Sequence, residues 1–397
     1  MDADPAAAPP AYSLWQLIGY MLGLGTWGFG GPVALVGYMH RDLVEGRRWI
    51  SDADYKEGLA LAQLMPGPLA AQLAIYLGYV HYRLTGATLA GLAFVLPSFF
   101  MVVALGAAYV AYGGIGWMQS VFYGVGAAVI GIIAMSSYKL ATRNVGKDKL
   151  LWAIFLASAA VTVVTKSEEV WLFLGAGVLV WLLRAPPTRW TGGRLHGVAL
   201  QVPVAAAVAA GAMDWNRLAE IGAFFAYAGS FVFGSGLAIV PFLYGGVVQQ
   251  HHWLTDRQFV DAVAVAMITP GPVVITTGFI GYLVAGFWGA VVAALATFVP
   301  CYLFTVVPAP YFKKHGRRPA IVAFVDGVTA AAIGAIAGAV IVIGQRSITD
   351  WVTAALAVVT ALVLWKFKKV QEPVIVLAAA LIGLAARYPY SASISGA

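Results

Sequence analysis

Two Pro-Gly-Pro triplets, Pro66-Gly67-Pro68 and Pro270-Gly271-Pro272, stand inside long apolar runs. Proline lacks an amide donor and disfavours helical geometry in the residue before it, so each triplet breaks a helix twice. Backbone groups freed in hydrocarbon are costly unless the break is buried in protein or lines a wet cavity. A helix that starts after each triplet directs free amides at such a cavity, and helix starts bind anions. The triplets therefore predict a site for a small anion.

Polar side chains near the two triplets add hydrogen-bond donors to this predicted site. They are Gln63, Gln72, Thr269, Thr276 and Thr277. Two glycine-rich segments, Phe29-Gly30-Gly31-Pro32 and Phe233-Gly234-Ser235-Gly236, either allow close helix packing or break a span beside the triplets. The alternative for the triplets is a pair of proline kinks that serve packing alone. Their symmetric repetition favours binding.

Three carboxylates are candidates for binding protons or ions. Glu57 and Asp261 lie on the segments that lead into the triplets, although a solvated helix end explains them equally well. Asp326 stands in an otherwise apolar helix, near enough to Arg318 to be an interfacial charge instead. Ser51 and Thr255 match N-cap residues and mark where these segments begin.

Composition places the chain in a membrane. Of 397 residues, 61% are hydrophobic and 10% are charged, against roughly 25% charged in soluble domains. Uncharged runs such as 84–138 and 262–312 are long enough for transmembrane helices. The net charge of +7 comes from short loops between apolar spans, which fits the positive-inside rule and not nucleic-acid binding. Cys301 is the single cysteine, which excludes internal disulfides and cysteine-built metal sites.

Motifs for other functions are missing from the sequence or lack their context. The Gly23–Gly28 segment fits GxGxxG, but it lies in a predicted span and favours helix packing. The sequence has no GxxxxGK[ST], HExxH or nucleophile elbow, so we expect neither an enzyme, nor a cofactor or metal, nor direct use of ATP.

The sequence is a duplication. Trp49 matches Trp253, which lies 204 positions later, and the same offset pairs Glu57 with Asp261 and the two triplets with each other. After one deletion the offset becomes 203, which pairs Gly124 with Gly327 and Gly131 with Gly334. A match of this length is hard to attribute to shared apolar composition.

Loop charges orient the two halves. In the first half the loop near 112–116 is neutral, and the next loop carries Lys139, Arg143, Lys147 and Lys149. In the second half the order is reversed, because Lys313, Lys314, Arg317 and Arg318 lie in the first of the matching loops. Since Lys and Arg favour the cytoplasmic side, the halves form an inverted-topology repeat.

We therefore predict an all-α integral membrane protein with about five spans per half and a re-entrant hairpin at each triplet; the alternative has thirteen spans. The predicted spans lie near 14–39, 86–111, 117–138, 150–166, 168–184, 220–247, 287–311, 321–344, 351–366 and 373–388. The predicted domains are a disordered tail (1–13), a first repeat (14–184), a linker (185–217) that lies at the interface near 197–213, a second repeat (218–390) and a C-terminal tail (391–397).

The Phe29-Gly30-Gly31-Pro32 segment, Trp49-Ile50-Ser51, the first triplet with Gln72, and their second-half echoes resemble the chromate ion transporter superfamily, long-chain two-domain type. The resemblance covers roughly residues 14–345. It implies export of chromate across the bacterial inner membrane, resistance to chromate, and coupling to protons or to exchange with an anion such as sulfate. It also implies that the family's functional residues lie at these motifs. Ser235 and Met267 depart from their first-half counterparts, Gly31 and Gln63, so the half-sites differ.

Several alternatives stay open at this stage. Sulfate or another oxyanion shares the shape and charge of chromate, and the sequence does not separate them. A membrane-embedded enzyme would need a catalytic cluster, and a passive channel would not need inverted repeats with broken helices. Membrane lipid surrounds such a chain, and a homodimer is compatible with it.

Overall fold

A computed structural model describes residues 12–29, 31–112, 116–165, 170–186, 214–230, 239–311, 318–348, 350–367, 370 and 372–394. These residues form helices and short connections, without strands. The helical two-half fold predicted from the sequence is confirmed. Gly30, Phe233, Gly234, Ser235, the far C-terminus and most of the predicted tail and linker lie outside the described residues.

The first apolar segment is a helical hairpin and not one span. Helix α1 (Leu14–Trp27) ends at Gly28, which is extended (φ −80°, ψ 91°), and the chain returns through α2 (Gly31–Met39) and the π-helix η1 (His40–Gly46). Tyr20 Oη donates to Asp42 Oδ2 over 3.2 Å, and the Tyr12 and Trp49 rings stack with centroids 5.0 Å apart. Both ends of the segment therefore lie at the same end of the bundle, and the predicted span 14–39 is wrong.

The matching segment of the second half contains the same kinds of helix. It comprises α8 (Trp215–Ser230), α9 (Ile239–Leu243) and the π-helix η3 (Tyr244–Gln250). The Phe224 ring lies 5.7 Å from the Trp253 ring, so α8 runs beside the residues that follow η3. The predicted span 220–247 is likewise a pair of helices that fold back.

The first Pro-Gly-Pro triplet is the tip of a second hairpin. Helix α3 (Asp52–Leu64) leads into it and α4 (Leu69–Tyr112) leads out. Tyr76 Oη donates to Glu57 Oε1 over 2.8 Å, so the two limbs run antiparallel. At Arg83 (φ 50°, ψ −139°) α4 reverses direction, and Gly78 meets Gly86 across the turn. This is the predicted re-entrant hairpin, and it does not fit the thirteen-span alternative.

The second triplet lies between α10 (Asp256–Ile268) and the short helix η4 (Val273–Ile275), which continues as α11 (Thr276–Val306). Helix α11 turns back at Ala285 and Gly286, where the backbone is not helical, and Gly281 meets Gly289. Ser51 and Thr255 cap α3 and α10 as predicted.

The two sets of hairpins enter the bundle from opposite ends. The long limbs of α4 and α11 are antiparallel, because Thr88 Oγ1 lies 2.8 Å from Tyr302 Oη while Gly106 lies against the Tyr282 ring. Arg257, at the start of α10, donates to the carbonyl of Gln119, beyond the far end of α4. We call the end with loop 47–51 and Arg83 the first end, and the end with the start of α10 the second end.

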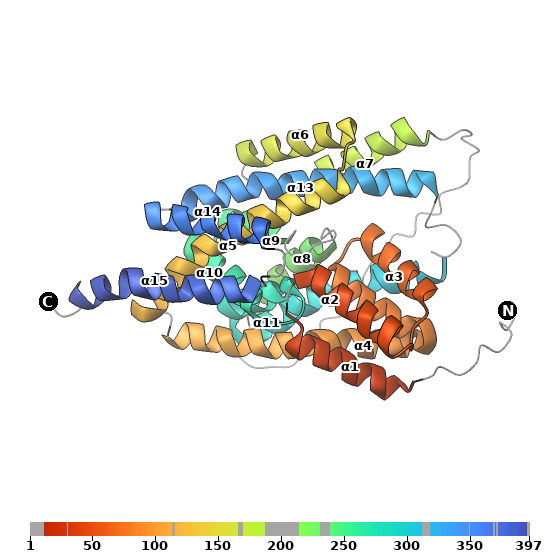
Figure 1. The fold of residues 1–397 in the computed structure, drawn as a ribbon, viewed down its shortest axis with the longest axis horizontal. Helices are drawn as coiled ribbons and strands as arrows, with labels where there is room; N and C mark the ends of the chain where they lie inside the picture. Colours follow the sequence, from red (N-terminus) through yellow and green to blue (C-terminus); the bar gives the residue numbers. More distant parts are fainter. Residues whose placement is uncertain are drawn as a thin grey trace, which may run out of the picture.

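The last two helices of each half pack against a helix of the other half. Helices α6 (Lys149–Thr165) and α7 (Val170–Arg184) lie along α13 (Pro319–Ser347), as Figure 1 shows. Helices α14 (Trp351–Lys366) and α15 (Glu372–Ile394) pack on α5 (Gly116–Asn144). The repeated glycines make the contacts: Gly334 meets the Phe155 backbone and Gly131 meets the Ala357 carbonyl.

Long apolar helices suited to crossing a bilayer occur in both halves. They are Leu69–Tyr112, Gln119–Lys139, Val273–Tyr311 and Pro319–Gln345, with shorter apolar helices at Lys149–Thr165, Trp171–Arg184, Trp351–Lys366 and Pro373–Ala386. Arg184 lies at the first end, because it pairs with Asp326 near the start of α13 (3.0 Å). Helix α8 starts at the second end, since Gly222 lies by Val292 and Gly229 by Thr297. The end of α7 and the start of α8 therefore lie at opposite ends of the bundle.

Candidate functional site

The hairpin tips meet in the middle of the bundle. The amide of Gly271, in the second triplet, donates to the carbonyl of Gly28 at the tip of the first α1–α2 hairpin over 3.0 Å. Ser98, midway along the long limb of α4, donates to Pro270 O over 2.8 Å and lies 3.4 Å from Gly25 O. One hairpin from each end therefore contributes its broken backbone to one buried region.

Gly271 is required at this meeting point for two physical reasons. Its φ of +95° is one that L side chains rarely adopt. A Cβ there would lie 2.0 Å from Ser98 Oγ. The Pro-Gly-Pro sequence therefore allows both the turn and the close approach of the two halves.

The first triplet has a different local structure. Gln72 is fully buried, and its Nε2 donates to Pro66 O over 2.7 Å, across Gly67 (φ +144°). The Oε1 of Gln72 has no hydrogen-bond partner among the described residues. Gln72 N bonds to Pro68 O, so the amides of residues 69–71 are those that a helix start leaves without an intrahelical acceptor.

The other predicted donors have local roles. The hydroxyls of Thr269, Thr276 and Thr277 donate to carbonyls of their own helical turns, those of Val265, Val273 and Val274. The side chain of Gln63 is exposed. Phe29 and Gly31 flank the tip of the α1–α2 hairpin, whereas the second-half equivalents Phe233 to Ser235 lie outside the described residues. The arrangement thus leaves backbone amides and Gln72 as the groups closest to the turns.

The three carboxylates lie in different environments. Asp261 is 3% exposed, and Tyr109 of the other half donates to its Oδ2 over 2.8 Å. Glu57 is partly exposed and bonds to Tyr76 of its own hairpin. Asp326 forms an ion pair with Arg184, which also pairs with Asp148. Sequence reasoning missed Tyr109, because nothing local to it signals a partner in the other half.

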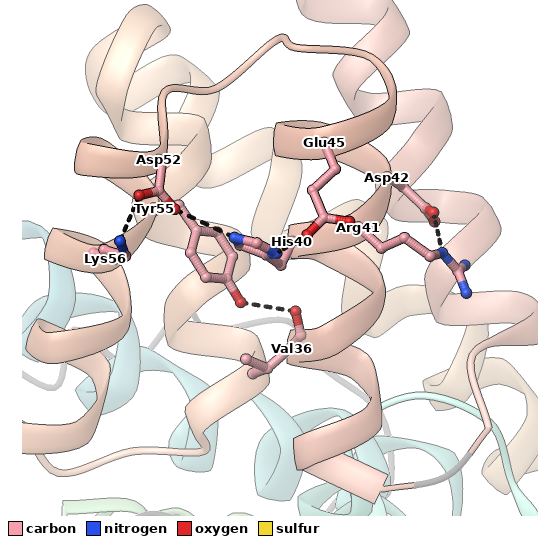
Figure 2. Close-up of polar contacts among 8 residues, drawn as sticks. All are labelled: Val36, His40, Arg41, Asp42, Glu45, Asp52, Tyr55 and Lys56. Carbon is pink, nitrogen blue, oxygen red and sulfur yellow. Dashed lines mark hydrogen bonds and ion pairs between the residues drawn. The ribbon is translucent and has the colours of Figure 1, made fainter.

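Polar contacts at the first end hold η1 against α3, as Figure 2 shows. His40 lies between Glu45 (3.2 Å) and Asp52 (3.3 Å), and Asp52 also pairs with Lys56. Tyr55 Oη donates to Val36 O over 2.8 Å. Arg41 points away from this cluster and pairs with Asp42 (2.8 Å). The contacts position the open end of the α1–α2 hairpin, where a groove of about 450 Å³ lies.

Comparison with known proteins accounts for the two halves. The family model described as Chromate transporter matches residues 15–181 and again 219–384. The chain belongs to the chromate transporter family. The two matched segments correspond to the two repeats, so each repeat is one unit of that family.

Curated relatives from the chromate transporter family cover nearly the whole chain. A chromate transport protein of Cupriavidus metallidurans is 71% identical over 96% of this chain and 94% of its own length. A probable chromate transport protein of Synechococcus elongatus is 62% identical over 94% of this chain and 96% of its own length. A chromate transport protein of Pseudomonas aeruginosa is 32% identical over 96% and 94%. No solved structure matches the chain.

Proposed function

We propose that this member of the chromate transporter family exports chromate from the bacterial cytoplasm across the inner membrane and so confers resistance. The observation that carries this proposal is the contact between Gly271 and Gly28, which joins hairpin tips that enter from opposite ends. Broken helices that meet at mid-depth are where inverted-repeat transporters bind their substrates. The high identity to proteins named chromate transport proteins supports chromate as the substrate.

The substrate site lies between the two triplets in this proposal. Its members are the residues at the described tips, Phe29, Gly31, Pro66–Pro68, Gln72 and Thr269–Pro272, with Gln63, Thr276 and Thr277 nearby and Gly30 and Phe233–Ser235 in the adjoining segments. Amides and glycine backbone suit a tetrahedral dianion, because they bind it without a buried arginine that would slow its release. The first end, with Arg41, Arg47, Arg48 and Arg83, is the cytoplasmic end by the positive-inside rule, so the two repeats are inverted in the membrane.

Asp261 is the proposed coupling group. A nearly fully buried carboxylate in a membrane bundle is costly when charged, and its facing polar groups are Tyr109 from α4 and Arg257 from its own helix. Asp326 pairs with Arg184, and Glu57 is partly exposed. Protonation of Asp261 would therefore change the contact between α10 and α4, which belong to different halves.

Flux into everted membrane vesicles tests the proposal. We expect chromate uptake that falls when the proton gradient is collapsed or when a counter-anion such as sulfate is withheld, and Asp261→Asn should lose the response to the proton gradient. Asp326→Asn is the matched control. Chromate uptake that persists unchanged without gradient and counter-anion contradicts coupling. Absence of chromate uptake combined with sulfate uptake would identify sulfate as the substrate.

A further inference from the structure

The groove between α1 and α2 leads from the first end toward the hairpin tips. Arg41, Asp42 and Arg47 line its mouth, Tyr20 and Gly23 its wall, and Gly28 and Phe29 its inner end. A Cβ at Gly19 or Gly23 would have no atom within 4 Å, so these glycines leave the space open. The groove ends at Gly28, whose carbonyl accepts from Gly271. It therefore connects the basic loop of the first end with the proposed substrate site.

Arg47 is the cation of the groove that has no acidic partner. Arg41 pairs with Asp42, whereas no carboxylate in the described part of the chain lies within ion-pair distance of Arg47. The Arg47 guanidinium instead lies over the Trp49 ring (4.6 Å) and the Tyr20 ring (5.3 Å). Stacking holds the guanidinium plane and leaves its N–H edge available, and that edge matches two oxygens of an oxyanion.

The corresponding region of the second half is filled with aromatic rings. At the positions matching Arg47, Arg41 and Gly23 the second half has His251, Gly245 and Tyr227. Phe242 lies 5.3 Å from Tyr227 and 5.8 Å from Phe224, and His251 stacks on Trp253 at 4.4 Å. The Phe224 ring also covers Gly246. The described part of this hairpin thus carries rings where the first hairpin carries a groove. Its stacked guanidinium, that of Arg217 over the Trp253 ring (5.4 Å), differs from that of Arg47 because it pairs with Glu220 (3.6 Å).

We infer that the α1–α2 groove is a capture site for a tetrahedral oxyanion, with Arg47 as its anion-binding residue, and that the described residues of the second end form no equivalent site. This inference deepens the proposed function and rests on it. An exporter gains from binding its substrate on the cytoplasmic side and from having no equal site where the substrate is released. The difference between Arg47 and His251 provides that asymmetry within a duplicated fold.

The first test is the concentration dependence of chromate uptake into everted vesicles, in which the cytoplasmic face is outside. Arg47→Gln should raise the KM about tenfold or more with little change in Vmax, because a charge-assisted bond to the anion is lost. The KM of Arg47→Lys should lie between the values for the wild type and for Arg47→Gln. Arg83→Gln removes a guanidinium at the same end but outside the groove, and should leave the KM unchanged.

A second variant keeps Arg47 and fills the groove. Gly23→Leu has open space for its side chain, so the helix should fold, and we expect the same rise in KM. Gly175→Leu, at a similarly open position on α7, is the control for a bulky residue on an apolar helix. Calorimetric titration of the purified protein with sulfate should show weaker binding in Arg47→Gln and Gly23→Leu.

The outcomes separate this inference from the proposed function. If the wild type transports chromate and Arg47→Gln keeps its KM, the capture site is overturned while the transporter stands. A fall in Vmax at constant KM in both groove variants also overturns it, because that result assigns the residues a structural role. A wild type without oxyanion flux and without sulfate binding overturns both.

Discussion

Gly271 donates its amide to the carbonyl of Gly28 over 3.0 Å, and this bond joins hairpins that enter the bundle from opposite ends. The two glycines belong to different repeats and to different kinds of hairpin, since Gly271 lies in a Pro-Gly-Pro turn and Gly28 ends α1. The contact is between backbones, so it depends on close approach and tolerates little side-chain bulk. The two repeats therefore share one central region.

Gly271→Ala should strongly reduce chromate uptake while the protein still inserts in the membrane. The φ of +95° and the 2.0 Å approach to Ser98 Oγ both oppose a Cβ, at a combined cost of about 2–4 kcal/mol. Uptake per amount of inserted protein is the measurement. Gly146→Ala shares a positive φ but has open space, so it should retain uptake. Equal uptake in the two variants would show that the hairpin tip has room for a Cβ at position 271.

Leucine at either triplet glycine should abolish transport. In Gly67→Leu the new side chain would displace Gln72, whose amide group lies 2.6 Å from the point that a Cβ on residue 67 would occupy. In Gly271→Leu it would separate the α10 tip from Ser98 and Gly28. Membrane insertion is followed by fractionation and transport by vesicle uptake. Full activity in both variants would remove the hairpin tips from the substrate site.

Gln72→Met should lower stability and transport together. Methionine keeps the length of the side chain but removes the bond from Nε2 to Pro66 O, which leaves a carbonyl at a helix break without its donor at a cost of about 1–3 kcal/mol. Thermal unfolding in detergent measures the loss. Gln63→Met is the control, because Gln63 is exposed. An unchanged melting temperature for Gln72→Met would show that water replaces the amide.

Gly334→Val should weaken the packing of α6, from the first half, on α13, from the second half. A Cβ at Gly334 would lie 2.2 Å from the Phe155 carbonyl oxygen, so α6 must move away from α13. Overpacking of this kind costs about 1–3 kcal/mol and should lower the melting temperature. Gly175→Val, at an open position, should not. Equal melting temperatures for the two variants would argue against tight packing of α6 on α13.

Asp52 should make the stability of the protein depend on pH in the acidic range. Lys56 and His40 bond to this exposed carboxylate and hold its pKa below the usual value. Because the pKa of Asp52 is lower in the folded state, the ionised carboxylate stabilises the folded protein at pH values above its unfolded-state pKa, about 3.9. This stabilisation is lost as pH falls through the folded-state pKa. Asp52→Asn should therefore show a smaller decline in melting temperature below about pH 4 than the wild type. Identical dependences of the melting temperature on pH in the two proteins would show that the bonds of Asp52 to Lys56 and His40 do not stabilise the folded state.

Much of the fold follows from interactions between residues close in sequence. The breaks at Pro66–Pro68 and Pro270–Pro272 come from proline geometry, and the helix starts at Asp52 and Asp256 come from their caps Ser51 and Thr255. The sequence left the break near Gly28 open, because the glycines of Phe29-Gly30-Gly31-Pro32 are as compatible with close helix packing as with a broken span. Hydropathy alone does not distinguish a crossing from two shorter limbs.

The sequence by itself determined that this chain lies in a membrane, that it is duplicated, and that each half carries a broken hairpin with a carboxylate at Glu57 or Asp261. Apolar composition, repeated motifs and local backbone rules suffice for those conclusions. Only the tertiary structure decided that Gly271 meets Gly28, that Tyr109 bonds to Asp261, and that α6 and α7 pack on α13. These contacts join residues far apart in the chain, and which helix faces meet depends on the packing of the whole bundle.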